Sequence, residues 1–175
     1  MKLIFFVFLA LISIKGHTQR IDSEASVVNF RIGNMRVNTV NGTFTGMRGT
    51  VQFDPQNLSG SAFSVCIDPA TVNTGINRRD RHLKEEAYFD VERFPSICYV
   101  SNIISTSEQG FVTRGKLTMK GITRNVTIPF IKEGNTFRGT LSLNRLDYNV
   151  GDGVSTFVVS NRVELEIICI IAPSP

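Results

Sequence analysis

A charged segment near the middle of the chain, TGINRRDRHLKEEAYFDVERFP at residues 74–95, holds most of the residue types that could do chemistry. Three arginines, an aspartate and a histidine fall within residues 78–82, so the segment could bind an anion, present a basic patch or close a structural opening. Catalysis is a weaker interpretation, because Asp80 and His82 do not form a triad and the chain has no GxSxG, Walker or GxGxxG motif. We therefore predict that the protein is not an enzyme.

Residue content also argues against metal and nucleic-acid sites. The three cysteines, Cys66, Cys98 and Cys169, include no CxxC pair and no Cys/His cluster, whereas a structural zinc site needs about four nitrogen or sulfur ligands. The 19 basic residues, set against 15 acidic ones, are spread along the chain and form no stripe that would neutralise phosphates. We expect no metal, no cofactor and no nucleic-acid partner.

The first residues form a separate unit. After a positively charged start, residues 3–14 are continuously apolar but shorter than the ~20 residues of a membrane span. This pattern is typical of a secretory signal peptide, and the small residue Thr18 places cleavage before Gln19. We therefore expect a signal peptide at residues 1–18 and an exported domain, periplasmic or secreted, at residues 19–175.

The rest of the chain is dominated by alternating apolar and polar residues, the period-two pattern of half-buried strands. The clearest case is GFVTRGKLTMK at residues 110–120, and another run covers residues 44–53. Turn signals such as Asn41-Gly42 fall between the runs. A sheet with one apolar face buries it most economically by closing into a barrel, so we predict an all-β fold of about eight antiparallel strands.

The interior of such a barrel is either packed by its own side chains or open around one small ligand. The inward residues here are Phe, Leu, Ile, Val and Met with interspersed glycines, which fits both cases. Periodicity alone leaves the two alternatives open.

Only the charged segment breaks the strand rhythm. Residues 76–91 are rich in helix formers, and Leu83, Ala87 and Val91 recur at every fourth position as a short amphipathic face. Pro95 ends the segment. We predict a short helical insert at residues 76–91 that lies across one mouth of the barrel.

The cysteines support a separate prediction. Cys66 and Cys98 both take the outward face of their strands, and those strands flank the insert. If the two strands pair directly, the cysteines can form a disulfide at the base of the insert, as an oxidising compartment permits. Cys169, on the inward face of the last strand, is expected to be a buried free thiol.

Three motifs together resemble the YceI-like family of exported bacterial lipocalin-like barrels that bind polyisoprenoid lipids. The pattern T-G-x-x-x-R-D-x-H-L begins at Thr74, G-x-L-T-x-K-G begins at Gly115, and N-R-x-D-aromatic begins at Asn144. The resemblance covers about residues 21–171, which is essentially the whole of the expected exported domain.

The resemblance implies an eight-stranded antiparallel lipocalin-like barrel that holds an isoprenoid lipid of the quinone or polyprenyl type and has no established enzymatic step. It implies as partners such a lipid, or another amphiphile, and transiently a membrane. The alternative is an enzyme or a structural, stress-related module on the same barrel with a self-filled core. The residues expected in the lid or at the lipid head group are Arg79, Asp80, His82 and Arg145. The residues expected along the tail are Phe30, Phe44, Val65, Ile67, Leu83, Phe89, Tyr99, Leu117, Met119, Val126, Ile128, Phe130, Leu141 and Leu143.

Overall fold

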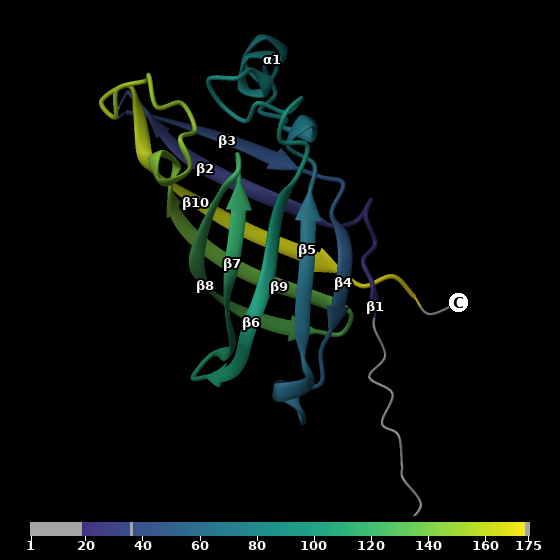
Figure 1. Cartoon of the computed structure of the whole chain (residues 1–175). Helices are drawn as coiled ribbons and strands as arrows, with labels where there is room; N and C mark the ends of the chain where they lie inside the picture. Colours follow the sequence, from purple (N-terminus) through teal and green to yellow (C-terminus); the bar gives the residue numbers. More distant parts are fainter. Residues whose placement is uncertain (1–18, 36, 174–175) are drawn as a thin grey trace, which may run out of the picture.

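The computed structural model describes residues 19–35 and 37–173 (Figure 1). These residues form one antiparallel sheet of ten strands, together with an α-helix and three short 3-10 helices. None of the described helices has the length and apolar character needed to cross a bilayer. The predicted signal peptide at residues 1–18 lies outside the described residues.

The strand order across the sheet is β1-β4-β5-β6-β7-β8-β9-β10-β2-β3. Consecutive strands from β4 to β10 are neighbours, so most of the sheet is a meander. The strands are β1 (Gln19–Arg20), β2 (Val27–Asn34), β3 (Asn38–Phe44), β4 (Arg48–Gln52), β5 (Ala62–Ile67), β6 (Ile97–Ser107), β7 (Gly110–Met119), β8 (Ile122–Glu133), β9 (Thr136–Asn144) and β10 (Val159–Ile170). The helices are α1 (Asn77–Lys84), η1 (Leu58–Gly60), η2 (Pro69–Thr71) and η3 (Arg145–Tyr148).

The sheet curls on itself into a half-barrel, with β4 to β7 crossing in front of β2, β3, β9 and β10 (Figure 1). The backbone ladder does not close between the edge strands β1 and β3. Two isolated antiparallel bridges tie these edges back to the shell, one between Ile21 and Ile171 and one between Thr43 and Asn73. The all-β antiparallel fold is therefore as predicted.

The structure has ten strands where the alternation predicts eight. Residues 44–53, expected as one strand, are divided between β3 and β4 by a turn in which Gly46 has a φ of 68°. Asn41-Gly42, expected as a turn, lies inside β3, and Gly42 is paired with Phe30. A Cβ on Gly42 would come within 2.3 Å of the Phe30 ring, so this glycine makes room for an aromatic side chain and does not bend the chain.

The helical insert is shorter than predicted. α1 ends at Lys84, because Glu85 takes an extended conformation with ψ of 166° and the next residues form turns. This change of direction brings Phe89 into the barrel, where its ring packs edge-on against Phe44 with centroids 5.3 Å apart. Burial of the aromatic ring outweighs the gain from another helical turn. Ala87 and Val91, expected on the helix, therefore lie in turns.

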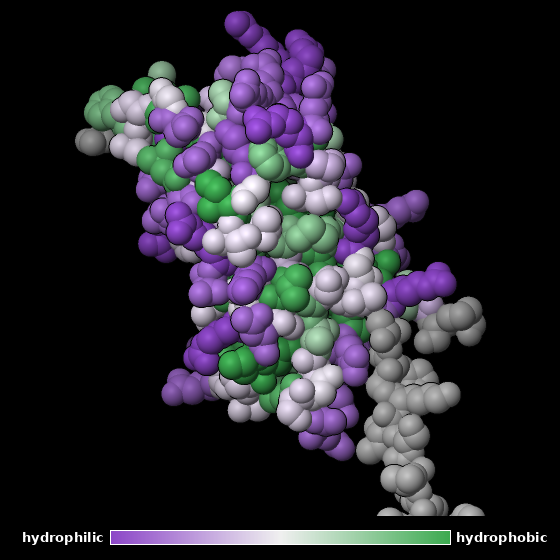
Figure 2. All heavy atoms as spheres, in the orientation of Figure 1, coloured by the Kyte–Doolittle hydropathy of each residue, from purple (hydrophilic) through white to green (hydrophobic). Residues whose placement is uncertain are grey.

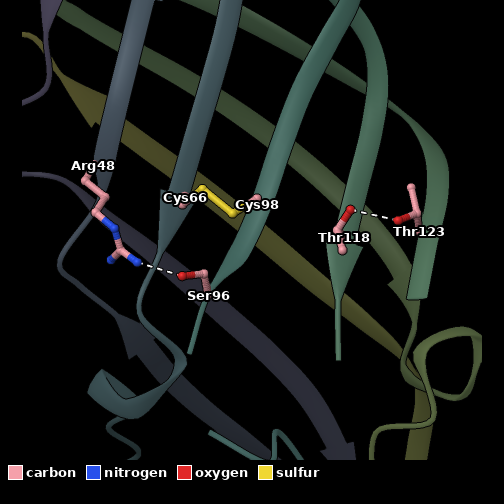
Figure 3. Close-up of a disulfide and its surroundings, with 6 residues drawn as sticks. All are labelled: Arg48, Cys66, Ser96, Cys98, Thr118 and Thr123. Carbon is pink, nitrogen blue, oxygen red and sulfur yellow. Dashed lines mark hydrogen bonds between the residues drawn. A yellow bond between two sulfur atoms is a disulfide. The ribbon is translucent and has the colours of Figure 1, made fainter. Parts of the chain in front are cut away.

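Cys66 and Cys98 are joined by a disulfide between β5 and β6. The two residues are direct partners across the antiparallel pair, with Cα atoms 4.1 Å apart. Figure 3 shows the bridge beside a 2.6 Å hydrogen bond from the Arg48 guanidinium to the Ser96 hydroxyl. Because β5 leads into residues 74–95 and β6 follows them, the bridge fixes the base of this stretch, which we call the lid segment.

Replacing both Cys66 and Cys98 with serine is expected to lower the free energy of unfolding by about 3–4 kcal/mol, because the disulfide joins residues with a sequence separation of 32. Chemical denaturation under non-reducing conditions measures this difference, and the wild type in reductant is the matched control. A double variant as stable as the oxidised wild type would show that the bridge adds no constraint.

Candidate functional site

The inner face of the curled sheet surrounds a cavity of about 860 Å³, lined by side chains from every strand from β2 to β10. Pockets that bind small molecules measure roughly 300–1,000 Å³ and are lined mainly by apolar side chains. Alternation is compatible with an interior packed by side chains or with one open around a ligand, and the structure has the open interior. The site is therefore a lumen and not a surface cleft.

Most residues predicted for the ligand tail line this cavity, namely Phe30, Phe44, Val65, Ile67, Leu83, Phe89, Tyr99, Leu117, Met119, Ile128, Phe130, Leu141 and Leu143. Val126 is the exception: it packs against the core cluster, outside the cavity lining. β8 pairs with β9 only between Phe130 and Glu133, so the half of β8 that carries Val126 diverges from β9. Alternation predicts which face a residue takes, but not where a strand leaves its neighbour.

A cluster of phenylalanines lies near the starts of β5, β7 and β9 and the end of β8. Figure 1 shows these strand ends on the side of the molecule away from α1. Phe63, Phe130 and Phe137 reach the cavity, and Phe53 and Phe111 pack behind them. Ring centroids in this group lie 5.0 to 6.1 Å apart, mostly edge to face, which is a favourable aromatic arrangement. We call this group the floor.

Two polar side chains interrupt the apolar wall above the floor. The hydroxyl oxygens of Tyr99 and Thr113 lie 2.6 Å apart, and Thr113 is buried. Burial raises the pKa of Tyr99, and the hydrogen bond with Thr113 opposes that rise. Because only one hydroxyl of the pair donates to the other, the second keeps a donor for a polar group of a ligand.

The end opposite the floor is the mouth, and the lid segment lies at this end (Figure 1). Arg78, Arg79, Arg81 and His82, all on α1, line the cavity here. Arg78 and Arg81 are exposed and belong to none of the ion pairs formed within residues 19–35 and 37–173. Polar groups are therefore concentrated where a bound molecule would meet solvent.

Arg79 and Asp80 hold α1 to the chain that precedes it. The backbone N–H and the hydroxyl of Thr74 both donate to Asp80 Oδ1, the former at 2.9 Å. Arg79 donates from Nε to the Thr74 hydroxyl at 2.7 Å and from Nη2 to the Thr74 carbonyl at 2.9 Å. Asp80 is not part of the cavity lining, so it fixes the lid segment and has no contact with the lumen.

His82 is the most adaptable of the predicted mouth residues. Its Nδ1 lies 3.0 Å from Glu85 Oε2, and its ring packs edge-on against Tyr88 with centroids 4.8 Å apart. The side chains of His82 and Glu85 are 56% and 62% exposed, so their contact adds little to stability. The pair can therefore rearrange around a ligand at small cost.

Arg145 lines the cavity, but its role differs from the one predicted. Its side chain is buried and donates all five guanidinium N–H groups to backbone carbonyls. Burial lowers the pKa of Arg145, and Tyr88 and Asp152 oppose the shift. No donor is left for a head group, so Arg145 instead holds together the loop between η3 and β10. The acceptors are the carbonyls of Val150, Gly151, Val154, Val159 and Ser160.

The cavity also contains residues that the sequence does not single out. Met47 lies in the turn between β3 and β4, and Tyr88 lies in the lid segment, so neither occupies an alternating strand position. Thr113 does occupy an inward position on β7, but it is polar, so a search for alternating apolar residues does not select it. Arg78 and Arg81 become cavity residues only through the placement of α1 over the mouth.

The YceI-like domain model matches residues 19–169 of the chain. The protein belongs to the YceI-like family. Protein YceI of Salmonella agona is 31% identical over 133 residues, which cover 73% of this chain and 70% of that protein. Protein YceI of Salmonella newport is 32% identical over 111 residues, which cover 62% of this chain and 58% of that protein.

Solved structures agree with this membership. Burkholderia cenocepacia BcnA has a TM-score of 0.79 and 26% identity, and the match covers 87% of this chain and 99% of that chain. A polyisoprenoid binding domain from Saccharophagus degradans has a TM-score of 0.66 and 16% identity, over 90% of this chain and all of that one, a likeness of fold alone. The YceI-like fold expected from the three sequence motifs is confirmed.

Cys169 is a buried free cysteine in the cavity wall, and its thiol gives a measurable property of the lumen. Burial raises its pKa from 9.0 to about 12, and a hydrogen bond with Ser26 opposes the rise. Because the thiolate is the nucleophile, iodoacetamide at pH 8 should alkylate the native protein about a thousandfold more slowly than the unfolded chain. Mass spectrometry of timed reactions measures both rates.

The same shift predicts a pH dependence. Above pH 9 the unfolded chain ionises Cys169 while the folded protein keeps it protonated, so stability should fall as the pH rises from about 9 to 12. Cys169→Ser should show no alkylation and a smaller loss of stability over this range. Equal alkylation rates for native and unfolded protein would contradict the buried, neutral thiol.

Proposed function

We propose that this protein is an exported binding protein that holds an amphiphilic isoprenoid lipid, of the quinone or polyprenyl type, in its cavity. The tail lies in the lumen and the head group lies at the mouth beside α1. The observation that carries this proposal is an apolar cavity of about 860 Å³ with a phenylalanine floor at one end and charged side chains at the other. An amphiphile has the same division into apolar and polar ends.

Apolar burial supplies the affinity in this proposal. Each methylene group removed from water contributes about 0.8 kcal/mol. A single hydrogen bond at the head group contributes a net of about 0.5–1.5 kcal/mol. We therefore expect the length of the tail to control affinity more strongly than the chemistry of the head group.

The head group has a defined set of candidate partners. Arg78, Arg81 and His82 supply donors at the mouth, and Glu85 supplies an acceptor. Arg79 contributes through Nη1, which its bonds to Thr74 do not use. The partners on this side of the cavity thus favour a head group that accepts several hydrogen bonds.

Binding without chemical conversion is part of the proposal. The Saccharophagus degradans relative is described as a polyisoprenoid binding domain, which supports a binding role. The lipid would then be stored or carried unchanged. Export rests on the apolar run at residues 3–14, and the Cys66–Cys98 disulfide suits an oxidising compartment such as the periplasm or the cell exterior.

Native mass spectrometry of protein purified under gentle conditions tests the proposal. The wild type should carry an added mass that organic solvent removes and that fragments as an isoprenoid. Leu143→Trp should lower the occupied fraction at least tenfold, because the indole fills part of the lumen beside the mouth. Ser142→Trp is the matched control, since Ser142 is the exposed neighbour on β9 and its variant should keep the lipid.

The two tryptophan variants also report on folding, because the natural chain contains no tryptophan. Indole emission at shorter wavelength in Leu143→Trp than in Ser142→Trp would show that the lumen variant is folded. An empty wild-type lumen, or equal lipid occupancy in both variants, would contradict the proposal and would favour a structural module on the same barrel.

The floor should act as a stop for the lipid tail. Phe63→Ala removes a ring that reaches the cavity, so it should raise the affinity for geranylgeraniol relative to farnesol by about tenfold, or ~1.4 kcal/mol. Competition against a fluorescent prenyl probe measures this ratio in wild type and variant.

Phe111→Ala is the control for the floor, because Phe111 stacks on Phe130 behind the cavity and does not line it. Both substitutions remove the same atoms from one aromatic cluster. The loss of the buried Phe63 ring should cost about 3–5 kcal/mol of stability, and the loss of the partly buried Phe111 ring should cost less. Only the Phe63 variant should change the preferred tail length. Equal ratios in both variants would show that the floor does not limit the tail.

A further inference from the structure

Large apolar side chains are exposed at the mouth end of the molecule. Met35, Val37, Phe157 and Val158 are 59%, 85%, 60% and 38% exposed, and we call this group the tip. In Figure 2 green spheres gather at the upper left, where Figure 1 places the turn after β2 and the loop before β10. Single exposed apolar residues are ordinary on a protein surface, but a projecting group of them marks an interaction site.

The tip is built from two chain segments that the fold holds together. The Met35 N–H donates to the Val158 carbonyl at 2.8 Å, and the neighbouring residues Asn34 and Val159 are paired between β2 and β10. Arg145 donates to the carbonyls of Val154 and Val159 at the base of the second segment. The apolar side chains are thus presented by an ordered projection.

The backbone of the first segment also argues against a purely structural role. Met35 has a φ of 49°, in the left-handed region where glycine or asparagine is usual. An exposed, β-branched valine follows at position 37 in the same turn. A turn that only reversed the chain would be more stable with small polar residues, so the fold itself does not account for the apolar side chains.

Two exposed arginines lie at the same end of the molecule. Arg78 and Arg81 on α1 are exposed at the mouth and belong to no ion pair within the described ranges. Of the acidic side chains near them, Glu85 contacts His82 and Glu86 contacts Arg93, while Asp80 accepts hydrogen bonds from Thr74 and remains a carboxylate. The tip segments, residues 35–37 and 154–158, contain no carboxylate.

We propose that the mouth end docks on the surface of an anionic phospholipid bilayer. The tip enters the boundary between head groups and acyl chains, and the α1 arginines contact the lipid phosphates, a division that suits interfacial membrane binding. With the mouth turned to the bilayer, an isoprenoid tail can pass into the lumen without crossing water. This last consequence rests on the proposed function, whereas docking itself does not.

Vesicle flotation with the exported domain tests the docking. The wild type should bind vesicles of phosphatidylcholine mixed with phosphatidylglycerol, and the double variant Met35→Ser/Val37→Ser should bind at least tenfold more weakly. The matched control is Val100→Ser/Ile103→Ser, because these β6 residues are 48% and 56% exposed but lie on the outer wall, away from the tip. This control should bind like the wild type.

Charge variants test the contribution of the α1 arginines separately from that of the apolar tip. Arg78→Gln/Arg81→Gln should weaken binding to the mixed vesicles about fivefold or more, and added salt should weaken the wild type in the same way, since surface charges are screened. Vesicles of phosphatidylcholine alone should bind the wild type and this variant equally and weakly.

The proposal is overturned if the wild type binds neither vesicle, or if the tip and wall variants bind alike. It is also overturned if size-exclusion chromatography shows a dimer that the tip variant dissolves while vesicles stay unbound, because the tip would then join two copies. Tip variants should keep their co-purified lipid in native mass spectrometry. Intact vesicle binding with an empty lumen would count against the proposed function and leave docking in place.

Discussion

The width of the shell is the constraint on which the rest of the molecule depends. A sheet of ten strands curls to a radius that its own inward side chains do not fill. Apolar residues at alternate positions therefore line a hollow and do not meet across the centre. Only at the floor, where phenylalanines from strands that are not neighbours in the sheet meet, does the interior become solid. The lumen, its closed end and its open end all follow from the geometry of the sheet.

The charged side chains at the open end divide into two groups by the use of their hydrogen bonds. Arg145 and Asp80 are committed to the fold, the first to five carbonyls and the second to Thr74. Arg78 and Arg81 keep their donors free of ion pairs within the described ranges. Counting donors and acceptors, and not charge alone, therefore decides which residues of the charged segment are available to a partner.

Alternation and motif resemblance predicted much of this structure, and the failures have identifiable causes. The inward faces of β5, β7 and β9 follow directly from period two, because sterics alone decide which way a strand residue points. The sequence predicts a turn at Gly42, but this glycine is required by the Phe30 ring on a neighbouring strand, which local sequence does not reveal. Arg145 resembled a head-group ligand because its carbonyl partners lie in a loop with no periodic signal. Val126 lies on the part of β8 that is not paired with β9, and alternation along one strand does not predict where that pairing ends.

The closed floor affects the rate at which the proposed ligand dissociates. A chain held in a tube with one opening must enter tail first and leave head first, along the path by which it came. When the protein is not docked on a bilayer, each further isoprene unit would be exposed to water before the last contact breaks, so the dissociation rate into water should fall steeply with tail length while the association rate changes little. The phenylalanine floor, by leaving a single exit, would thereby set the residence time of the bound lipid.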